Sequence, residues 1–433
     1  MGLQEFVQKL KEENKITEIN TTVSKDLEMA GVLKEIEPKP VLFNSVKESD
    51  FKVVGNLFSS KQLIADYLGV QINDITQTVL NAIENPTKPT EVETGSCQDV
   101  VIDDVDLDKI PILKHCAKDG GNYISSGVIF ARDAELGENL SFHRCMQISK
   151  DEFTVRILQR HLNHFIEKNG GNLDVAIAVG INPNLLLAGA TSIELGRDET
   201  EIANTLEKVE LVKAKTSDVM VPVDAEFILE GTLTSELKDE GKFVDLTGTY
   251  DFVRPQRVFK IKKITHRKNA LWHALLPGGM EHRVLMGMPK EPTILREVNK
   301  VCKCLDVNIN PGGCSWLHAI VKIKKENTDD GKKAITAAFA GHKSLKHAFI
   351  VDDDIDINDP YDVEWAMSTR FQAGKDFVDM GRKKGSSLDP SSDHETRETD
   401  KRGFDLTKPV NADSDKYDKV EFPKVDLKKI LDG

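Results

Sequence analysis

The sequence predicts a mixed protein of several α+β and α/β domains, in which a β-rich central part lies between two α/β parts. Its length of 433 residues exceeds the size at which a single hydrophobic core keeps growing. Short β-rich runs ending in Gly, Asn or Asp turns fill residues 106–288, and helical and strand-like runs alternate in residues 289–433. We therefore expect an N-terminal α/β domain at 1–105, a β domain at 106–288 and a C-terminal α/β domain at 289–433.

Composition and charge are those of a globular protein in a reducing compartment. Hydrophobic residues make up 39% of the chain, and the formal charge of −13 argues against nucleic acid as a partner, because phosphate binding needs a basic surface. Six cysteines are spread thinly with no secretory signal, which favours free thiols and a cytoplasmic protein. No apolar run reaches the ~18–20 residues of a membrane span, and the run from Met1 is typical of an amphipathic helix, not of a signal peptide.

The pattern of the central part is typical of a barrel or a sandwich. A helical insertion at 198–208 interrupts the strands, because ETEIANTLEK has helical spacing. The basic run KIKKITHRK from Lys260 alternates like a strand with one solvated face, which favours a sheet surface over a nucleic-acid site. The expected strands are 123–132, 140–149, 175–181, 225–233, 258–265 and 270–276.

The C-terminal part is expected to follow a linker at GMPKEP, residues 287–292. Helical ILREVNKVC, strand-like HAIVKIKK, helical AITAAFAGH and strand-like HAFIVDDD then alternate as in a βαβ-type domain. After Gly385 the chain becomes polar. We expect roughly the last forty residues to form a surface tail that docks on its own domain or on a neighbouring subunit.

Two acids and one arginine are candidates for a shared site. Glu240 and Asp245 are separated by a Gly-containing turn in EGKFVD, and Arg144 ends the earlier segment NLSFHR. Carboxylates with this spacing can converge on one guanidinium, which holds one acid ionised and tunes the other as a proton donor. The alternative is a buried ion-pair network without catalysis, which also perturbs pKa values.

The chain resembles the UbiD-type decarboxylases, which use prenylated flavin mononucleotide (prFMN). The segments PVLFNSV, DGGNYISSGVIF, EGKFVDLTGTYD, THRKN and LKHAFIVDDDIDINDPYDVEWAMSTR match this family in order, from about Val41 to about Pro390. The resemblance implies that the central domain is a split β-barrel that binds the flavin. It also implies that Arg144 orients the substrate carboxylate, that Glu240 holds the arginine, and that Asp245 donates the proton.

The resemblance further implies a divalent metal that bridges the protein and the flavin phosphate. Asn139, His161 and Glu199 fall where the family places metal ligands. This mixed oxygen and nitrogen set suits Mn²⁺ or Mg²⁺ better than structural zinc. Glu201 replaces Glu199 if the alignment slips by two residues, and His164 is expected to support the site or to be structural.

Other residues match positions that the family uses around the flavin phosphate. By the same resemblance a potassium ion lies nearby, held partly by the backbone carbonyls of residues 187–190. The acidic string 352–356, which looks like a metal site in isolation, is expected to be a structural turn. The implied flavin contacts are Ser126, Ser141, Arg144, Arg160 and Lys346. A lysine before a buried strand is otherwise an ordinary snorkelling residue, and this alternative stays open.

The implied reaction is the non-oxidative decarboxylation of an α,β-unsaturated acid. Loss of CO₂ beside an alkene leaves a vinyl carbanion, so a cofactor must accept the electrons, and a separate flavin prenyltransferase must supply that cofactor. GSSLDPS near Gly385 resembles the archaeal subgroup of the family. This subgroup implies trans-anhydromevalonate 5-phosphate as substrate and isopentenyl phosphate as product, in an archaeal mevalonate pathway. The family as a whole implies a homo-oligomer of at least two chains.

Two alternatives stay open. The first is a decarboxylase of an aromatic acid, such as a prenylated 4-hydroxybenzoate in quinone synthesis, whose tail calls for an apolar channel. A phosphorylated acid calls instead for additional Arg or Lys side chains in the pocket. The segment PGGMEH from Pro277 is expected to line that pocket. The second alternative is a flavin-binding carrier, which would have no use for a proton donor at Asp245. The candidates for phosphate contacts are Arg254, Arg257, His282 and Arg283.

Overall fold

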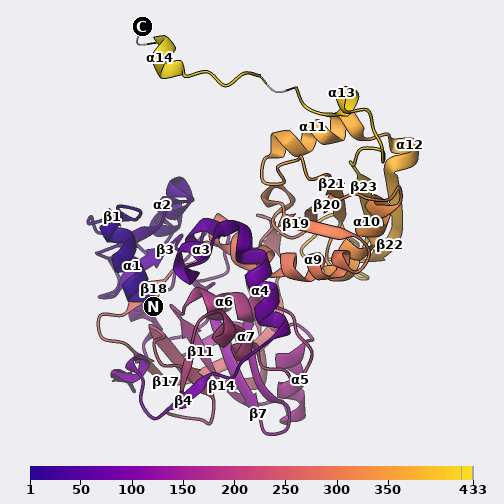
Figure 1. Cartoon of the computed structure of the whole chain (residues 1–433). Coiled ribbons are helices and arrows are strands. Elements are labelled where there is room, and N and C mark those ends of the chain that lie inside the picture. Colours follow the sequence, from indigo (N-terminus) through magenta and orange to yellow (C-terminus); the bar gives the residue numbers. More distant parts are fainter. Residues whose placement is uncertain (421, 432–433) are drawn as a thin grey trace.

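The computed structural model describes residues 1–420 and 422–431 and shows a mixed α/β protein of several domains, as the sequence predicts (Figure 1). In this view the central elements lie below, the N-terminal elements lie at the upper left, and the C-terminal elements lie at the upper right. Among the described residues, no helix is long and apolar enough to cross a membrane. All six cysteines are free thiols.

The N-terminal sheet takes one strand from the central part of the chain. The elements of the N-terminal part of the chain are α1 Leu3–Glu12, β1 Thr17–Ile19, α2 Glu28–Ile36, β2 Val41–Phe43, β3 Lys52–Gly55, α3 Lys61–Leu68, α4 Ile75–Glu84, β4 Thr90–Val92 and β5 Val100–Ile102. The sheet order is β1-β2-β3-β18, and β18 (Leu271–His273) pairs in parallel with β3. Because β4 and β5 pair in turn with central strands, chain segments cross residue 105 in both directions. The domain boundaries at 105 and 288 stay predictions.

The central part is built on a nine-stranded sheet of order β6-β9-β10-β17-β14-β11-β7-β8, with β5 paired to β17. Its remaining elements are β6 Tyr123–Ile124, β7 Val128–Asp133, β8 Gly137–Phe142, β9 Cys145–Gln147, β10 Glu152–Val155, α5 His161–Lys168, β11 Leu173–Val179, α6 Pro183–Ala190, α7 Glu199–Leu206, β12 Glu210–Lys213, β13 Met220–Pro222, β14 Phe227–Glu240, β15 Phe243–Val244, β16 Tyr250–Asp251 and β17 Arg254–His266. Each strand range that the sequence predicts overlaps an observed strand, although β11, β14 and β17 extend beyond the predicted bounds, and the helical insertion is α7.

Both faces of this sheet are covered, which explains the near-continuous apolar runs of its inner strands. Along β7, Val128 and Phe130 belong to one hydrophobic cluster, and Ile129 and Ala131 belong to the other. Successive side chains of a strand point to opposite faces. The first cluster includes residues of α1, α3, α4, α6 and α7, and the second includes residues of α2 and α5.

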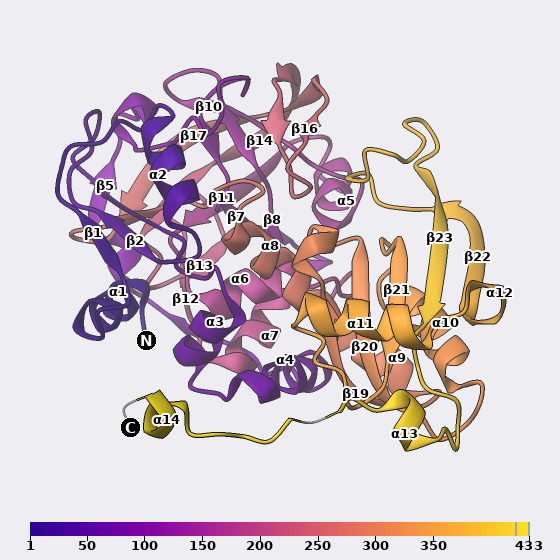
Figure 2. The same ribbon diagram turned by 90° about the horizontal axis from the view of Figure 1, so that it is seen from above.

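The C-terminal part is a five-stranded sheet of order β19-β20-β21-β23-β22, seen along the right of Figure 2. Its parallel pair β20 and β21, with α10 between them in the chain, confirms the predicted βαβ pattern. The acidic string after β21 pairs with Arg370 through Asp352 and Asp354, at 3.1 and 2.6 Å. The elements are α8 Met280–Gly287, α9 Glu291–Asn299, β19 Lys303–Ile309, β20 His318–Lys324, α10 Asp330–Gly341, β21 His347–Val351, α11 Pro360–Arg370, α12 Ala373–Asp376, β22 Phe377–Lys384, β23 Glu398–Asp405, α13 Ser414–Tyr417 and α14 Leu427–Leu431.

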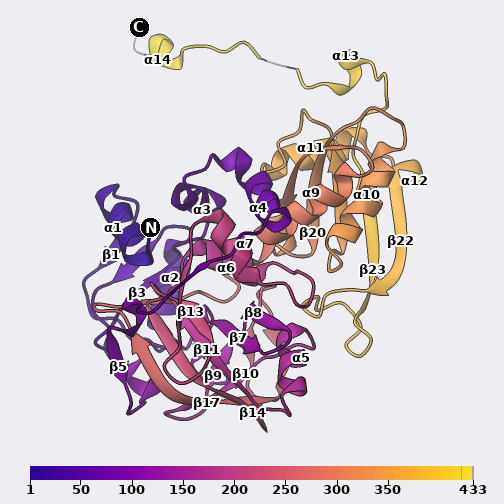
Figure 3. The same ribbon diagram turned by 60° about the horizontal axis from the view of Figure 1, so that its bottom comes forward.

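The linker expected at 287–292 is wrong, because this segment is helical. α8 continues through a 3₁₀ turn at 288–290 directly into α9. Pro289 and Pro292 lie in the first turns of their helices, where a missing N–H costs no intrahelical bond. Figure 3 shows α4 near both α7 and α9, and it packs on these two helices.

The polar tail begins later than the sequence predicts. β23 is an inner strand of the C-terminal sheet, and it buries Thr399, Lys401 and Asp405. The sequence does not reveal this strand, because its buried positions carry polar residues and its composition is that of an exposed segment. Residues 408–419 still dock on the C-terminal part, because Lys408 N–H donates to Asp352 at 2.7 Å and the Tyr417 carbonyl accepts from Arg370 at 3.2 Å. The chain leads away from the folded body only after α13, toward α14 (Figure 1, Figure 3).

Two glycines let the loop before β6 touch the end of β14. A Cβ on Gly241 would lie 2.3 Å from Gly120 Cα, and Gly120 N–H donates to the Lys242 carbonyl at 2.9 Å. The hydroxyl of Tyr123 donates to the Gly241 and Lys242 carbonyls at 3.1 and 3.2 Å. This contact fixes the backbone next to Glu240, the last residue of β14.

Substituting Gly241→Ala is expected to lower the free energy of unfolding by about 1–3 kcal/mol, because the new methyl group overlaps backbone that cannot move freely. Gly31→Ala is the matched control. No atom lies within 4 Å of a Cβ at Gly31 in α2, so this change is expected to stabilise the protein by about 0.5–1 kcal/mol. Urea unfolding midpoints measure both, and equal midpoints for the two variants would contradict the close approach.

Candidate functional site

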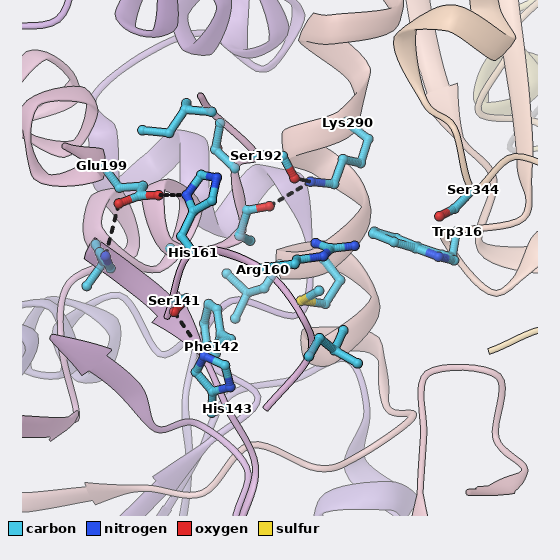
Figure 4. Close-up of a pocket in the computed structure, with 18 of the residues that line it drawn as sticks. Ser141, Phe142, His143, Arg160, His161, Ser192, Glu199, Lys290, Trp316 and Ser344 are labelled. Atoms are coloured by element: carbon cyan, nitrogen blue, oxygen red, sulfur yellow. Dashed lines mark hydrogen bonds and ion pairs between the residues drawn. The ribbon is translucent and has the colours of Figure 1, made fainter. Parts of the chain in front are cut away.

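A cavity of about 870 Å³ lies where the central sheet meets the C-terminal part of the chain. Its walls come from β8 and the segment after it, the starts of α5 and α7, the end of α6, the helices α8 and α9, and the end of α10. Figure 4 shows part of this wall. Because the volume is that of a ligand pocket and charged groups converge on it, this cavity is the candidate functional site.

Arg144 is the centre of a buried ion-pair network in this wall. It donates from Nε and Nη2 to both oxygens of Glu240, at 2.7 and 3.0 Å, and from Nη1 to Asp245 Oδ2 at 2.9 Å. Its Cζ lies 4.7 Å from the centroid of the Phe243 ring. Burial opposes the charged form, but the hydrogen bonds and charge of Glu240, with the charges of Asp245 and Asp251, raise the pKa of Arg144. The structure therefore brings the three catalytic candidates together.

Asp251 is a third acid on Arg144, and the sequence analysis missed it. Its Oδ2 accepts from Arg144 Nη2 at 2.8 Å, and its Oδ1 accepts from Arg254. Strands β15 and β16 pair Phe243 with Asp251 across a turn at residues 245–248. That turn is the signal in the sequence, because strands paired across it place residue 251 level with residue 243.

His282, on α8, also lines the cavity. Gly278 N–H donates to its Nδ1 at 3.0 Å, so the neutral ring carries its proton on Nε2. Burial lowers the pKa of His282, and the charge of Asp245 opposes this shift. PGGMEH therefore contributes a neutral hydrogen-bond donor to the wall. The other three candidates for a substrate phosphate, which lie outside the cavity wall, are Arg254, Arg257 and Arg283.

The metal candidates Asn139, His161 and Glu199 all line the cavity. His161 Nδ1 lies 4.0 Å from Glu199 Oε1 (Figure 4). Burial raises the pKa of Glu199 to about 8, against the opposing hydrogen bond from Leu140 N–H at 2.9 Å. A divalent cation beside this carboxylate would offset the cost of burying its charge. Glu201 does not line the cavity, so the geometry favours Glu199 over it.

A hydrogen-bond relay orients Asn139. Its Nδ2 donates to Ser141 Oγ at 2.9 Å, Ser141 lies 2.9 Å from His143 Nε2, and His143 Nδ1 donates to the Arg156 carbonyl at 2.8 Å. Burial lowers the pKa of His143 to about 4, so the neutral ring accepts from Ser141. No described residue donates to Asn139 Oδ1, which is left to bind a cation. Within the described ranges no three His, Cys, Asp or Glu side chains form a metal site, so this amide would be the third ligand.

Lys290 is a second residue that the sequence analysis missed, because its segment was interpreted as a linker. Its buried ammonium donates to the Ala190 carbonyl at 2.8 Å and to Ser192 Oγ at 3.1 Å, and it lies 5.6 Å from the Trp316 ring centroid. Burial, together with the charge of Arg160, lowers the pKa of Lys290 to about 7. In Figure 4 the Arg160 guanidinium points between Lys290 and Trp316. Lys290 and Arg160 thus form a cationic wall.

The expected phosphate contacts are divided between the cavity and other places. Ser141 and Arg160 line the cavity. Ser126 is buried beside it, where its hydroxyl donates to a carbonyl of β18 at 2.6 Å. Lys346 lies outside the wall and pairs with Asp389 at 3.0 Å. The contacts of Ser126 and Lys346 with the flavin phosphate stay predictions.

Two of the carbonyls of residues 187–190, which are expected near a potassium ion, accept hydrogen bonds from side chains. The Thr191 hydroxyl donates to the Leu187 carbonyl at 2.8 Å, and Lys290 occupies the Ala190 carbonyl. The Lys290 ammonium therefore lies at one end of the segment that is expected to hold the potassium ion. The potassium ion stays a prediction.

Three family profiles match consecutive parts of the chain. They describe the N-terminal domain of 3-octaprenyl-4-hydroxybenzoate carboxy-lyase at residues 7–83, its Rift-related domain at 88–280 and its C-terminal domain at 283–406. The chain is also 42% identical, over 426 residues, to the anhydromevalonate phosphate decarboxylase of Methanothermobacter thermautotrophicus, a match that covers 96% of this chain and 99% of that one. The chain belongs to the UbiD family. It is accordingly a carboxy-lyase, that is, a decarboxylase.

Solved UbiD-class structures share its fold. The UbiD-class enzyme HmfF from Pelotomaculum thermopropionicum, in complex with FMN, matches with a TM-score of 0.95 and 33% identity over 99% of both chains. An evolved dimeric form of HmfF in complex with prFMN matches with a TM-score of 0.91 and 32% identity, over 99% of this chain and 100% of that one. The UbiD resemblance that the sequence motifs predict is confirmed.

Substituting Glu199→Gln is expected to weaken Mn²⁺ binding by at least about 100-fold in the presence of FMN, because a neutral amide replaces the only carboxylate of the ligand set. Titration followed by the EPR signal of free Mn²⁺ measures the affinity. Glu201→Gln, two residues along α7, is the matched control and should leave the affinity unchanged. Loss of binding in the Glu201 variant alone would instead identify Glu201 as the ligand.

Proposed function

We propose that this UbiD-family enzyme converts trans-anhydromevalonate 5-phosphate to isopentenyl phosphate and CO₂, with prFMN as cofactor, in an archaeal mevalonate pathway. The observation that carries the proposal is the network of Arg144, Glu240 and Asp245, in which Arg144 and Asp245 line a cavity whose wall also contains the metal candidates. It offers a cation for a carboxylate and an acid for the carbon that loses it. The relative from Methanothermobacter, matched over nearly its full length, is named for this activity.

The chain has residues suited to a flavin phosphate and its metal. Asn139, His161 and Glu199 would hold Mn²⁺ or Mg²⁺, and the cationic wall of Lys290 and Arg160 would face the phosphate. The unpaired Asn139 oxygen and the buried Glu199 carboxylate support this fit. Complexes of HmfF with FMN and prFMN support the flavin itself. When bound, prFMN supplies an acceptor for the electron pair that remains as CO₂ leaves.

The chain's own residues position the substrate and move the proton. Glu240 occupies Nε and one Nη2 proton of Arg144, which leaves the Nη1 side for Asp245 and the substrate carboxylate. The bond between the carboxylate carbon and the alkene carbon breaks, CO₂ departs, and the alkene carbon takes a proton from protonated Asp245. Because the Asp245 side chain is 17% exposed, water can return that proton before the next turnover.

Three further features belong to the same proposal. The nine-stranded sheet would act as the split β-barrel that surrounds the flavin. A flavin prenyltransferase would supply the cofactor. The working enzyme would be a homo-oligomer of at least two chains, which the dimeric HmfF form supports.

The decisive test is a product assay on protein co-expressed with a flavin prenyltransferase, with prFMN confirmed by mass spectrometry. We expect CO₂ and isopentenyl phosphate from trans-anhydromevalonate 5-phosphate. If fully loaded enzyme gives no product from this acid but decarboxylates a 4-hydroxybenzoate, the aromatic alternative is correct.

Asp245→Asn is expected to keep its flavin and to lose turnover by about 10²–10⁴-fold, because the amide cannot donate an acidic proton to carbon. Flavin absorbance and initial rates, measured on one preparation, separate the two effects. Unchanged turnover in this variant would exclude Asp245 as the proton donor. A loss of flavin together with activity would assign Asp245 a structural role.

A further inference from the structure

Arg156 is a cation in the cavity wall that the mechanism above does not use. It follows the last residue of β10, its side chain is 15% exposed, and it lines the cavity. None of the described residues accepts a hydrogen bond from its guanidinium, and its one ion-pair contact is a long one, from Nε to Asp251 Oδ2 at 3.9 Å. A largely buried guanidinium whose five N–H donors find no acceptor in the protein is suited to bind an anion that enters the cavity.

The backbone holds Arg156 directly opposite Arg144. Strands β9 and β10 are antiparallel with Val155 level with Cys145, and Arg156 N–H donates to the Arg144 carbonyl at 3.1 Å. Two like charges at such positions destabilise a sheet. Both guanidinium groups reach the same oxygen, Asp251 Oδ2, at 2.8 and 3.9 Å. The two cations are therefore fixed side by side before any substrate arrives.

Asp251 does not satisfy both arginines. Its Oδ2 is bonded to Arg144 and its Oδ1 to Arg254, which also repels Arg156. When Asp245 carries the proton that it donates, three arginines face only the two carboxylates of Glu240 and Asp251. One positive charge is then in excess at the end of the cavity where the substrate carboxylate binds.

We propose that Arg156 binds the phosphate group of the substrate while Arg144 binds its carboxylate, an assignment that rests on the proposed function. A planar guanidinium fits two phosphate oxygens with parallel hydrogen bonds. The phosphate of the flavin has a different partner set, since the metal candidates and the cationic wall of Lys290 and Arg160 are available to it. Arg156 thus selects a short acid that carries a second anion.

The test compares two substrates on the prFMN-loaded enzyme, namely the phosphorylated acid and the same unsaturated acid with a free hydroxyl in place of the phosphate. In Arg156→Gln we expect kcat/KM for the phosphorylated acid to fall by about 100-fold, because two charge-assisted hydrogen bonds are lost. Most of this fall should come from a higher KM. For the hydroxy acid the same variant should change kcat/KM by less than about threefold, because the lost contact is absent. Arg156→Lys should recover part of the loss, since it keeps the charge but not the paired donors.

Arg257→Gln is the matched control. This arginine lies on β17, donates to the carbonyls of Gly171 and Thr234 at 3.1 and 3.2 Å, and is outside the cavity wall. It should leave the ratio between the two substrates unchanged.

The outcomes separate this assignment from the proposed function. If Arg156→Gln lowers kcat/KM equally for both substrates, the assignment is overturned and the proposed function is left intact. The same holds if a loss of FMN affinity accounts for the whole fall in kcat/KM. No turnover of the phosphorylated acid by loaded wild-type enzyme overturns the proposed function, and the assignment with it.

Discussion

The bidentate pair between Arg144 and Glu240 is the contact on which the geometry of the site depends. The Glu240 side chain is fully buried, and burial raises its pKa while Arg144 opposes this shift. Removing one partner of such a pair typically costs about 3–5 kcal/mol, because the other charge stays buried and unpaired. The pair ties the end of β14 to the segment after β8. The hairpin of β15 and β16, which follows directly from β14, is held in place with it.

One strand links the two kinds of chemistry in the cavity. β8 carries Asn139 and Ser141 and leads two residues later into Arg144, so one metal candidate and the arginine of the acid network share a single support. Sites built on strands keep their geometry better than sites on loops. The protein as a whole carries a formal charge of −13, yet the cavity gathers several cations. The anion-binding surface is therefore local and enclosed, which is why the overall composition conceals it.

Much of the fold and the centre of the site could be predicted from the sequence. Arg144, Glu240 and Asp245 stand in short motifs whose spacing survives folding, and the metal candidates line the cavity at the predicted positions. What failed depends on tertiary structure. Asp251 reaches Arg144 only through hairpin register, Lys290 becomes part of the wall because helices continue through Pro289 and Pro292, and Lys346 meets Asp389 across a fold that local sequence does not encode.

The pairing of β18 with β3 constrains how the chain can fold during synthesis. β3 is complete at Gly55, but its second neighbour is not made until the ribosome has reached His273. Val53 and Val54, both fully buried in the finished sheet, must wait at an open edge while the central strands emerge. Open edges of apolar strands invite pairing with other chains. The N-terminal part is thus finished after the central part that follows it, and nascent chains shorter than this length expose an apolar strand edge that the finished protein covers.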